Sequence, residues 1–176
     1  MKFLYLGTPS YVQEYLQVKG DLTYTSSKLD PSLLKKFDWI ISYGYTNILS
    51  KEHIQAAKNP ILNLHISYLP FNRGFSPNYW SWVKQTPKGV TIHQIDEGLD
   101  TGPIYLQKEV NFSGNETLSS SYLILKLEIE KLFIQNFDKI IIGNIKPYKQ
   151  VGGGSYQAKK DLPKNIDWNE YVSELI

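Results

Sequence analysis

Two polar side chains, Asn63 and His65, stand two positions apart inside an apolar run. On a strand, residues at this spacing point to the same face, while the leucine and isoleucine that alternate with them point into the core. An aspartate, Asp100, follows in a turn bounded by glycines. An amide donor, an imidazole and a carboxylate can together polarise a carbonyl group and move a proton. The combination indicates an acyl-transfer site at one strand end.

Taken singly, each of these residues also has an ordinary structural explanation. A lone histidine in an apolar strand is more often a hydrogen-bonded core residue than a catalyst. An asparagine before it can satisfy a strand end, and an aspartate between glycines is common turn chemistry. Only the ordered combination favours a site over packing.

The composition narrows the classes of function. The chain has 176 residues, 41% of them hydrophobic and 20% charged, which is typical of one soluble globular domain. A formal charge of +2 is too small to indicate a nucleic-acid partner, so none is expected, and the lack of cysteine excludes disulfides and thiolate chemistry. The three histidines are too scattered to predict a metal site. No segment resembles an export signal or a membrane span, so the cytoplasm is the expected location.

Strands and helices alternate along the predicted fold. Apolar or alternating runs predict strands at 2–6, 22–25, 39–43, 61–66, 90–95 and 104–110. Helices are predicted at 11–18, after Asp30–Pro31, at 51–57 with Ser50 as cap, and from Ser76–Pro77. This order predicts a Rossmann-like α/β fold, a mostly parallel sheet flanked by helices, with ligands at the carboxyl ends of its strands.

Two further helix boundaries follow from capping residues. Thr8–Pro9 predicts the start of the first helix, and Asn115 predicts the start of a long helix at 116–142 that Gly143 ends. An apolar stripe on the long helix predicts either core or a dimer seam, so a homodimer is possible. The stripe consists of Leu118, Tyr122, Leu125, Ile129, Phe133, Phe137 and Ile140.

The ordered motifs resemble those of a known family. N-x-H-x-S-x-L-P-x-x-R-G runs from Asn63 to Gly74, and H-x6-D-x-G runs from His93 to Gly102. Both are similar to motifs of the folate-dependent formyltransferases, which include glycinamide ribonucleotide transformylase, methionyl-tRNA formyltransferase and the sugar N-formyltransferases. The resemblance is strongest over about residues 38–110.

The resemblance implies a co-substrate and a set of site residues. It implies 10-formyltetrahydrofolate as formyl donor and Asn63, His65 and Asp100 as the catalytic residues. Residues implied to contact the folate are Tyr43, Gly44, Tyr45, Ile48, Asp96, Gly98 and Leu99. Residues implied to bind the acceptor or support the site are Ser67, Arg73, Gly74 and His93.

The resemblance also implies a role for each catalytic residue. A neutral primary amine attacks the formyl carbon directly, and Asn63 and His65 donate hydrogen bonds to the developing oxyanion. Asp100 is expected to raise the pKa of His65 and to shuttle the proton, through water. His93 is read equally as a residue that orients the carboxylate and as a buried structural histidine. Arg73, with Gly74, is read equally as facing an anionic acceptor and as ordering its loop.

The chain organisation bears on the acceptor. Only about thirty residues separate the turn at Gly7 from the strand at 39–43, so the amino-terminal half of the fold is expected to be shortened. Residues 1–145 are predicted to form the catalytic domain and 146–176 a small carboxyl-terminal extension. The Gly-Gly-Gly-Ser-Tyr stretch of this extension resembles that of sugar-modifying members, although Gln157 stands where many of them have histidine.

The first hypothesis is therefore formyl transfer to the amine of a nucleotide-linked amino sugar. A formyl-folate hydrolase, with water in place of the amine, is one alternative. A folate- or nucleotide-binding module without turnover is another. Methionyl-tRNA formylation is disfavoured, because the large basic carboxyl-terminal domain that it uses is not expected in this chain.

Overall fold

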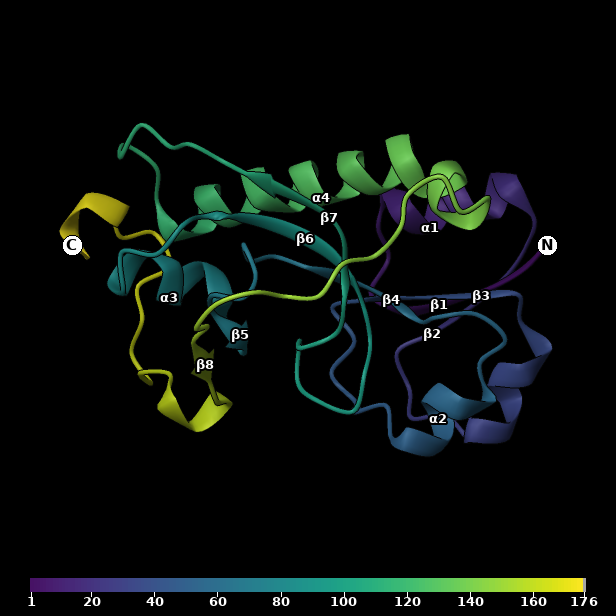
Figure 1. Ribbon diagram of the computed structural model, residues 1–176. Coiled ribbons are helices and arrows are strands. Elements are labelled where there is room, and N and C mark those ends of the chain that lie inside the picture. Colours follow the sequence, from purple (N-terminus) through teal and green to yellow (C-terminus); the bar gives the residue numbers. More distant parts are fainter. Residues whose placement is uncertain (176) are drawn as a thin grey trace.

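A six-stranded mixed sheet forms the centre of the molecule (Figure 1). The computed structural model describes residues 1–175. The strand order is β2-β1-β3-β4-β6-β7; neighbours from β2 to β4 run parallel, and β6 and β7 add antiparallel pairings at the other edge. The strands are β1 (Lys2–Gly7), β2 (Asp21–Thr25), β3 (Trp39–Tyr43), β4 (Leu62–His65), β6 (Gly89–Gln94) and β7 (Ile104–Glu109). The predicted Rossmann-like fold is confirmed.

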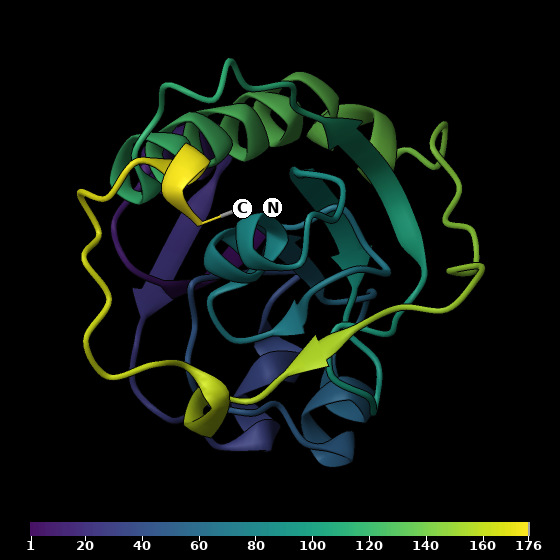
Figure 2. The same ribbon diagram turned by 90° about the vertical axis from the view of Figure 1, so that its left-hand side faces the viewer.

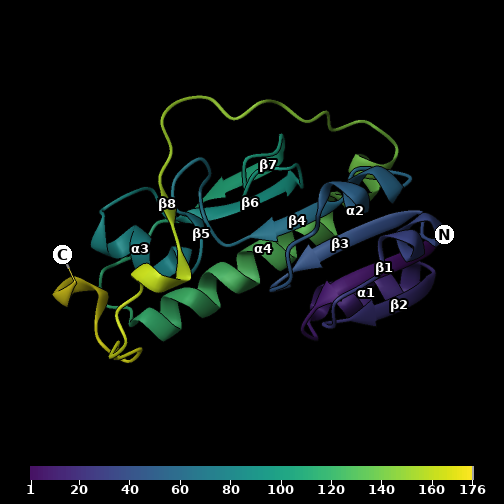
Figure 3. The same cartoon turned by 90° about the horizontal axis from the view of Figure 1, so that it is seen from below.

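Helices cover both faces of the sheet. Helices α1 (Tyr11–Lys19) and α4 (Leu118–Ile141) lie on one face, and α2 (Lys51–Ala56) with the 3-10 helix η1 (Pro31–Lys36) lies on the other (Figures 1 and 3). Helix α3 (Pro77–Val83) packs at the end nearer the carboxyl terminus. Between β2 and β3 the only regular element is the short η1, which accounts for the shortened amino-terminal half of the fold.

Helix α4 supplies much of the main core. Leu125, Ile129, Phe133, Phe137 and Ile140 are buried against apolar side chains of β1, β3, β4 and β6. The predicted stripe is therefore core, with one correction: Tyr122 is 46% exposed, because it lies to one side of the face that meets the sheet. No helix within residues 1–175 is long and apolar enough to cross a bilayer.

Both predicted helix starts were displaced by two residues. Helix α1 begins after Ser10, not after Thr8, because the Ser10 carbonyl accepts the first helical N–H groups while its hydroxyl bonds Tyr5 Oη at 2.8 Å. Helix α4 begins after Thr117, whose hydroxyl accepts the backbone N–H of Ser120 at 3.1 Å. Asn115 stands in the preceding turn instead.

The segment after α4 returns across the molecule. It forms a bridge between Tyr148 and Ile104, and then strand β8 (Tyr156–Gln157) pairs in parallel with β5 (Arg73–Gly74). Figure 2 shows this segment wrapping around the outside of the fold toward the carboxyl terminus. Its last part packs Val172 into a small cluster with Tyr79, Trp82 and Leu118. The extension therefore contacts several elements of the main fold.

Candidate active site

Asn63 and His93 are cross-strand partners on the sheet face opposite α4. Antiparallel β4 and β6 pair these two residues directly, and Asn63 Nδ2 lies 3.0 Å from His93 Nε2. His93 Nδ1 lies 2.8 Å from the carbonyl oxygen of Gln94, which can only accept. Nδ1 therefore carries the proton in the neutral ring, and Nε2 accepts the N–H of Asn63. This contact fixes the orientation of the amide.

Asp100 approaches the same point from the loop between β6 and β7. Its Oδ2 accepts the backbone N–H of Gly74 at 2.8 Å, and its Oδ1 lies 3.3 Å from Asn63 Nδ2. The backbone of Asp100 has a φ of 54°, a left-handed conformation that aspartate tolerates better than most residues. The turn thus directs the carboxylate inward.

His65 completes the group. Its Nε2 is 3.7 Å from Asp100 Oδ2 and 3.4 Å from the carbonyl oxygen of Asn72, so this nitrogen carries the proton in the neutral ring. The His65 ring stands nearly perpendicular to that of His93, with centroids 6.1 Å apart. The structure therefore brings together all three residues of the predicted trio, with His93 beside them.

The pKa values of Asp100 and His65 are both lowered, for different physical reasons. Burial raises the pKa of Asp100, but the neighbouring His65 and His93 and the Gly74 N–H outweigh it and hold that pKa well below its usual range. For His65, burial lowers the pKa more than the Asp100 charge raises it. The Asp100 charge therefore acts on His65 in the expected direction, but desolvation outweighs it and the net pKa of His65 is lowered. At neutral pH the site holds a carboxylate beside a neutral imidazole.

A pocket of about 300 Å³ opens beside this group. Five of the residues that the resemblance implied for folate contact line it: Tyr45, Ile48, Asp96, Gly98 and Leu99. The pocket also reaches Asn63, His93 and Asp100, so it is continuous with the candidate catalytic group. Ser42, Leu49 and Ile95 line it as well and were not singled out from the sequence.

Tyr43 and Gly44 do not line the pocket. Side chains alternate along β3, so Ser42 faces the pocket while Tyr43 faces α4 and is buried in the main core. Asp96 has a second task, because its Oδ1 accepts the Gly98 N–H at 3.0 Å and the Thr101 hydroxyl at 2.6 Å. These bonds order the turn that carries Asp100.

Three of the implied supporting residues, Ser67, Arg73 and Gly74, do not line the pocket and lie in the segment that follows β4. Ser67 is buried and donates its hydroxyl to the carbonyl of Phe71 at 2.5 Å. The Arg73 guanidinium bonds the side-chain oxygen of Gln150, with Nη2 at 2.8 Å. Gly74 has a φ of 94°, and an added Cβ there would lie 2.3 Å from the Gln157 carbonyl oxygen. Ser67 and Gly74 therefore shape the loop.

Two residues that contact the candidate site were not singled out from the sequence. Asn72 is fully buried and offers its carbonyl to His65, and Gln150 bonds both Arg73 and the loop of Asp100. Motif spacing carries no signal for Gln150, because its partners, two backbone carbonyls and the Arg73 side chain, are far away in the sequence. Asn72 stood within the quoted motif, but only the fold shows that its main chain meets the histidine.

Comparison with known proteins places this site in a family. The profile of the family described as formyl transferase matches residues 13–135. The chain belongs to the formyl transferase family. Its candidate catalytic group lies at the end of the matched β4 and in the matched β6–β7 loop.

The relatives fall into two groups by the names they bear. A methionyl-tRNA formyltransferase of Thermodesulfovibrio yellowstonii is 42% identical over 97% of this chain and 58% of its own length. A dTDP-4-amino-4,6-dideoxyglucose formyltransferase of Mycobacterium bovis is 30% identical over 78% of this chain and 59% of its own length. The chain thus spans a little over half of these relatives.

One solved structure matches along almost its whole length. The formyltransferase PseJ of Anoxybacillus kamchatkensis is 41% identical, with a TM-score of 0.91 over 100% of this chain and 98% of the other. That protein was solved with UDP-4,6-dideoxy-4-formamido-L-AltNAc and tetrahydrofolate. The match includes the segment after α4.

Proposed function

We propose that this protein transfers a formyl group from 10-formyltetrahydrofolate to the primary amine of a nucleotide-linked amino sugar. The observation that carries the proposal is the convergence of Asn63, His65 and Asp100 beside a pocket, within a fold that matches PseJ from end to end. The acceptor class follows PseJ, which was solved in complex with a UDP-linked 4-formamido sugar. An amine at the corresponding position is the acceptor we favour.

The donor fits the pocket by its chemistry. Ile48, Leu49, Ile95 and Leu99 give apolar walls that suit a flat heterocycle, and the polar catalytic group stands at one end. A folate placed there would present its formyl group toward Asn63. Folate complexes of PseJ and of a Helicobacter canadensis N-formyltransferase share this fold and support the choice of donor.

Asn63 is the proposed oxyanion donor. Its Nδ2 lies 3.0 Å from His93 Nε2 and 3.3 Å from Asp100 Oδ1. The contact with Asp100 is the one exchanged for the oxyanion that forms when the amine attacks, because the carboxylate keeps the Gly74 N–H as a donor. His93 keeps the amide in position during this exchange, which favours its orienting role over a purely structural one.

Asp100 and His65 are the proposed proton-transfer pair. The attacking nitrogen carries an extra proton after bond formation, and this proton must leave before the tetrahydrofolate nitrogen departs. A buried carboxylate beside a neutral imidazole can take it and return it to the leaving nitrogen. No covalent enzyme intermediate is required, in keeping with a chain that has no cysteine.

A second candidate acceptor is methionyl-tRNA. The 42% identity to the Thermodesulfovibrio yellowstonii protein supports it, although this chain covers 58% of that relative. We retain residues 1–145 as the proposed catalytic domain for either acceptor. The small charge of +2 favours the nucleotide sugar, because tRNA binding depends on dense phosphate contacts.

Mass spectrometry of reaction products tests the proposal. Purified protein is incubated with 10-formyltetrahydrofolate and, separately, UDP- and dTDP-linked 4-amino and 3-amino sugars, initiator methionyl-tRNA, or no amine. A formylated nucleotide sugar is the expected result. Formyl-methionyl-tRNA alone would reassign the acceptor, formate release without amine would identify a hydrolase, and folate binding without any product would indicate a binding module.

A further inference from the structure

Gln150 joins two loops of the candidate site from outside the motif region. Its Nε2 donates to the carbonyl oxygens of Asp100 at 2.8 Å and Gly102 at 2.9 Å. Its Oε1 accepts from Arg73 Nη2 at 2.8 Å and Nε at 3.3 Å. Both ends of one amide are therefore used, and each end holds a different loop.

The same segment holds the second loop through its main chain. We call residues 148–157 the strap. Ser155 Oγ accepts the N–H of Asn72 at 2.8 Å, and the Ser155 carbonyl accepts the N–H of Arg73 at 2.9 Å. The end of the strap forms β8, which pairs with β5. Strand β5 contains Gly74, whose backbone N–H binds the Asp100 carboxylate. The strap thus fixes the backbone groups that face His65 and Asp100.

We propose that Gln150 is a positioning residue that holds the Asp100 carboxylate in its working place, so that the strap is part of the active site. The backbone of Asp100 is in the left-handed conformation. The hydrogen bond from Gln150 Nε2 to the Asp100 carbonyl oxygen restrains that backbone directly. The Arg73 bond restrains the loop from the other side, next to Gly74. This inference rests on the proposed function, because it assumes that Asp100 takes part in transfer.

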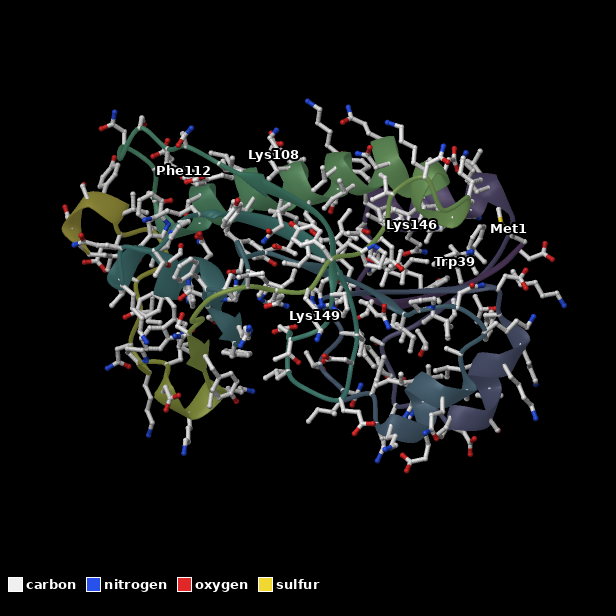
Figure 4. All side chains as sticks on the ribbon, in the orientation of Figure 1. Met1, Trp39, Lys108, Phe112, Lys146 and Lys149 are labelled. Atoms are coloured by element: carbon white, nitrogen blue, oxygen red, sulfur yellow. The ribbon has the colours of Figure 1, made fainter. Side chains whose placement is uncertain are left out.

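The Gln150 side chain donates hydrogen bonds through Nε2 and accepts them through Oε1, and substitutions can separate these two functions. Gln150→Glu keeps an acceptor for Arg73 but removes both N–H donors and places a carboxylate against two carbonyl oxygens. Gln150→Ala removes both ends. Lys149→Ala is the matched control, because Lys149 is the neighbouring exposed side chain on the strap, labelled in Figure 4.

The expected result is a loss in kcat of roughly 10–100-fold for both Gln150 variants, with KM for the folate changed less. Lys149→Ala should retain wild-type kcat. In an Asp100→Asn background the Gln150→Glu change should cost little more, because the group it positions is already absent. A full, additive loss in that background, or wild-type kcat in Gln150→Glu, would overturn the proposal.

A measurement without turnover separates this inference from the proposed function. The ring signals of His65 are followed by NMR titration in wild type, Gln150→Glu and Lys149→Ala. The nearby Asp100 charge raises the pKa of His65, so displacement of the carboxylate should lower that pKa in Gln150→Glu only. An unchanged titration would contradict the positioning role whatever reaction the protein catalyses, and inactivity of the wild type would count against the proposed function alone.

Discussion

Asp100 combines, in one residue, a left-handed backbone, a buried carboxylate and three neighbours that stabilise its charge. We expect Asp100→Asn to lower kcat by about 10²–10⁴-fold, because the amide keeps the shape of the side chain but cannot take up a proton. Steady-state kinetics with the identified acceptor measure the loss. Wild-type kcat in a folded Asp100→Asn protein would remove the carboxylate from the proposed mechanism.

The lowered pKa of His65 predicts how stability depends on pH. The unfolded chain binds a proton at His65 near pH 6.5, whereas the folded chain resists it because the ring is buried. The free energy of unfolding should therefore fall as pH decreases below about 6.5, by at most ~1.4 kcal/mol per pH unit from this residue. Above that pH the contribution is constant.

Denaturant titrations between about pH 5 and 8 measure this dependence, because this range brackets the ordinary pKa of histidine. His65→Gln should reduce the slope below about pH 6.5. The lowered pKa of Asp100 affects stability in a more acidic range. Its contribution to the free energy of unfolding is present above about pH 4 and is lost as pH falls further. An identical slope in wild type and His65→Gln would show that His65 is not buried in its neutral form.

At the scale of elements, α4 provides the base on which β4 and β6 are held. Phe133 is fully buried in its apolar face and stacks on Phe137 with ring centroids 4.7 Å apart. Phe133→Ala should lower the free energy of unfolding by about 3–5 kcal/mol through lost burial and a cavity. Leu127→Ala, on the same helix but at a side chain 57% exposed, should change it by less than about 0.5 kcal/mol. Chemical denaturation compares the two; equal losses would mean that α4 packs differently.

The short β5–β8 pairing links the strap to the site. An added Cβ at Gly74 would collide with the Gln157 carbonyl at 2.3 Å, and its φ of 94° disfavours any side chain. Gly74→Ala should therefore reduce both stability and kcat, because it displaces the N–H that binds Asp100. Calorimetry and kinetics on the same preparation test this. A loss of stability with unchanged kcat would separate β5 from the catalytic group.

Most of the strands and helices could be predicted from the sequence. Apolar runs such as 39–43 and 61–66 located the strands, since burial on both sides leaves a strong signal. Helix starts were placed two residues early because several capping residues stand close together near Thr8 and Asn115. Side-chain alternation along β3 also explains why Ser42, rather than Tyr43, lines the pocket.

The molecule as a whole brings together groups that the sequence keeps far apart. Asn63, His65 and Asp100 were singled out from motifs, whereas the contact of the Asn72 carbonyl with His65 and that of the Gln150 amide with the Asp100 loop exist only in the folded chain. Such contacts leave no residue pattern to read. The proposed acceptor likewise rests on the end-to-end match with PseJ, not on any single motif.

Asn63 and its neighbours are proposed to accelerate formyl transfer. The most direct test compares single-turnover transfer from 10-formyltetrahydrofolate by wild type and Asn63→Ala, with fold checked by circular dichroism. We predict product with wild type and a rate lower by about 10²–10³-fold with Asn63→Ala, because one oxyanion donor is lost. Equal rates from two equally folded proteins would show that Asn63 does not stabilise the transition state of formyl transfer.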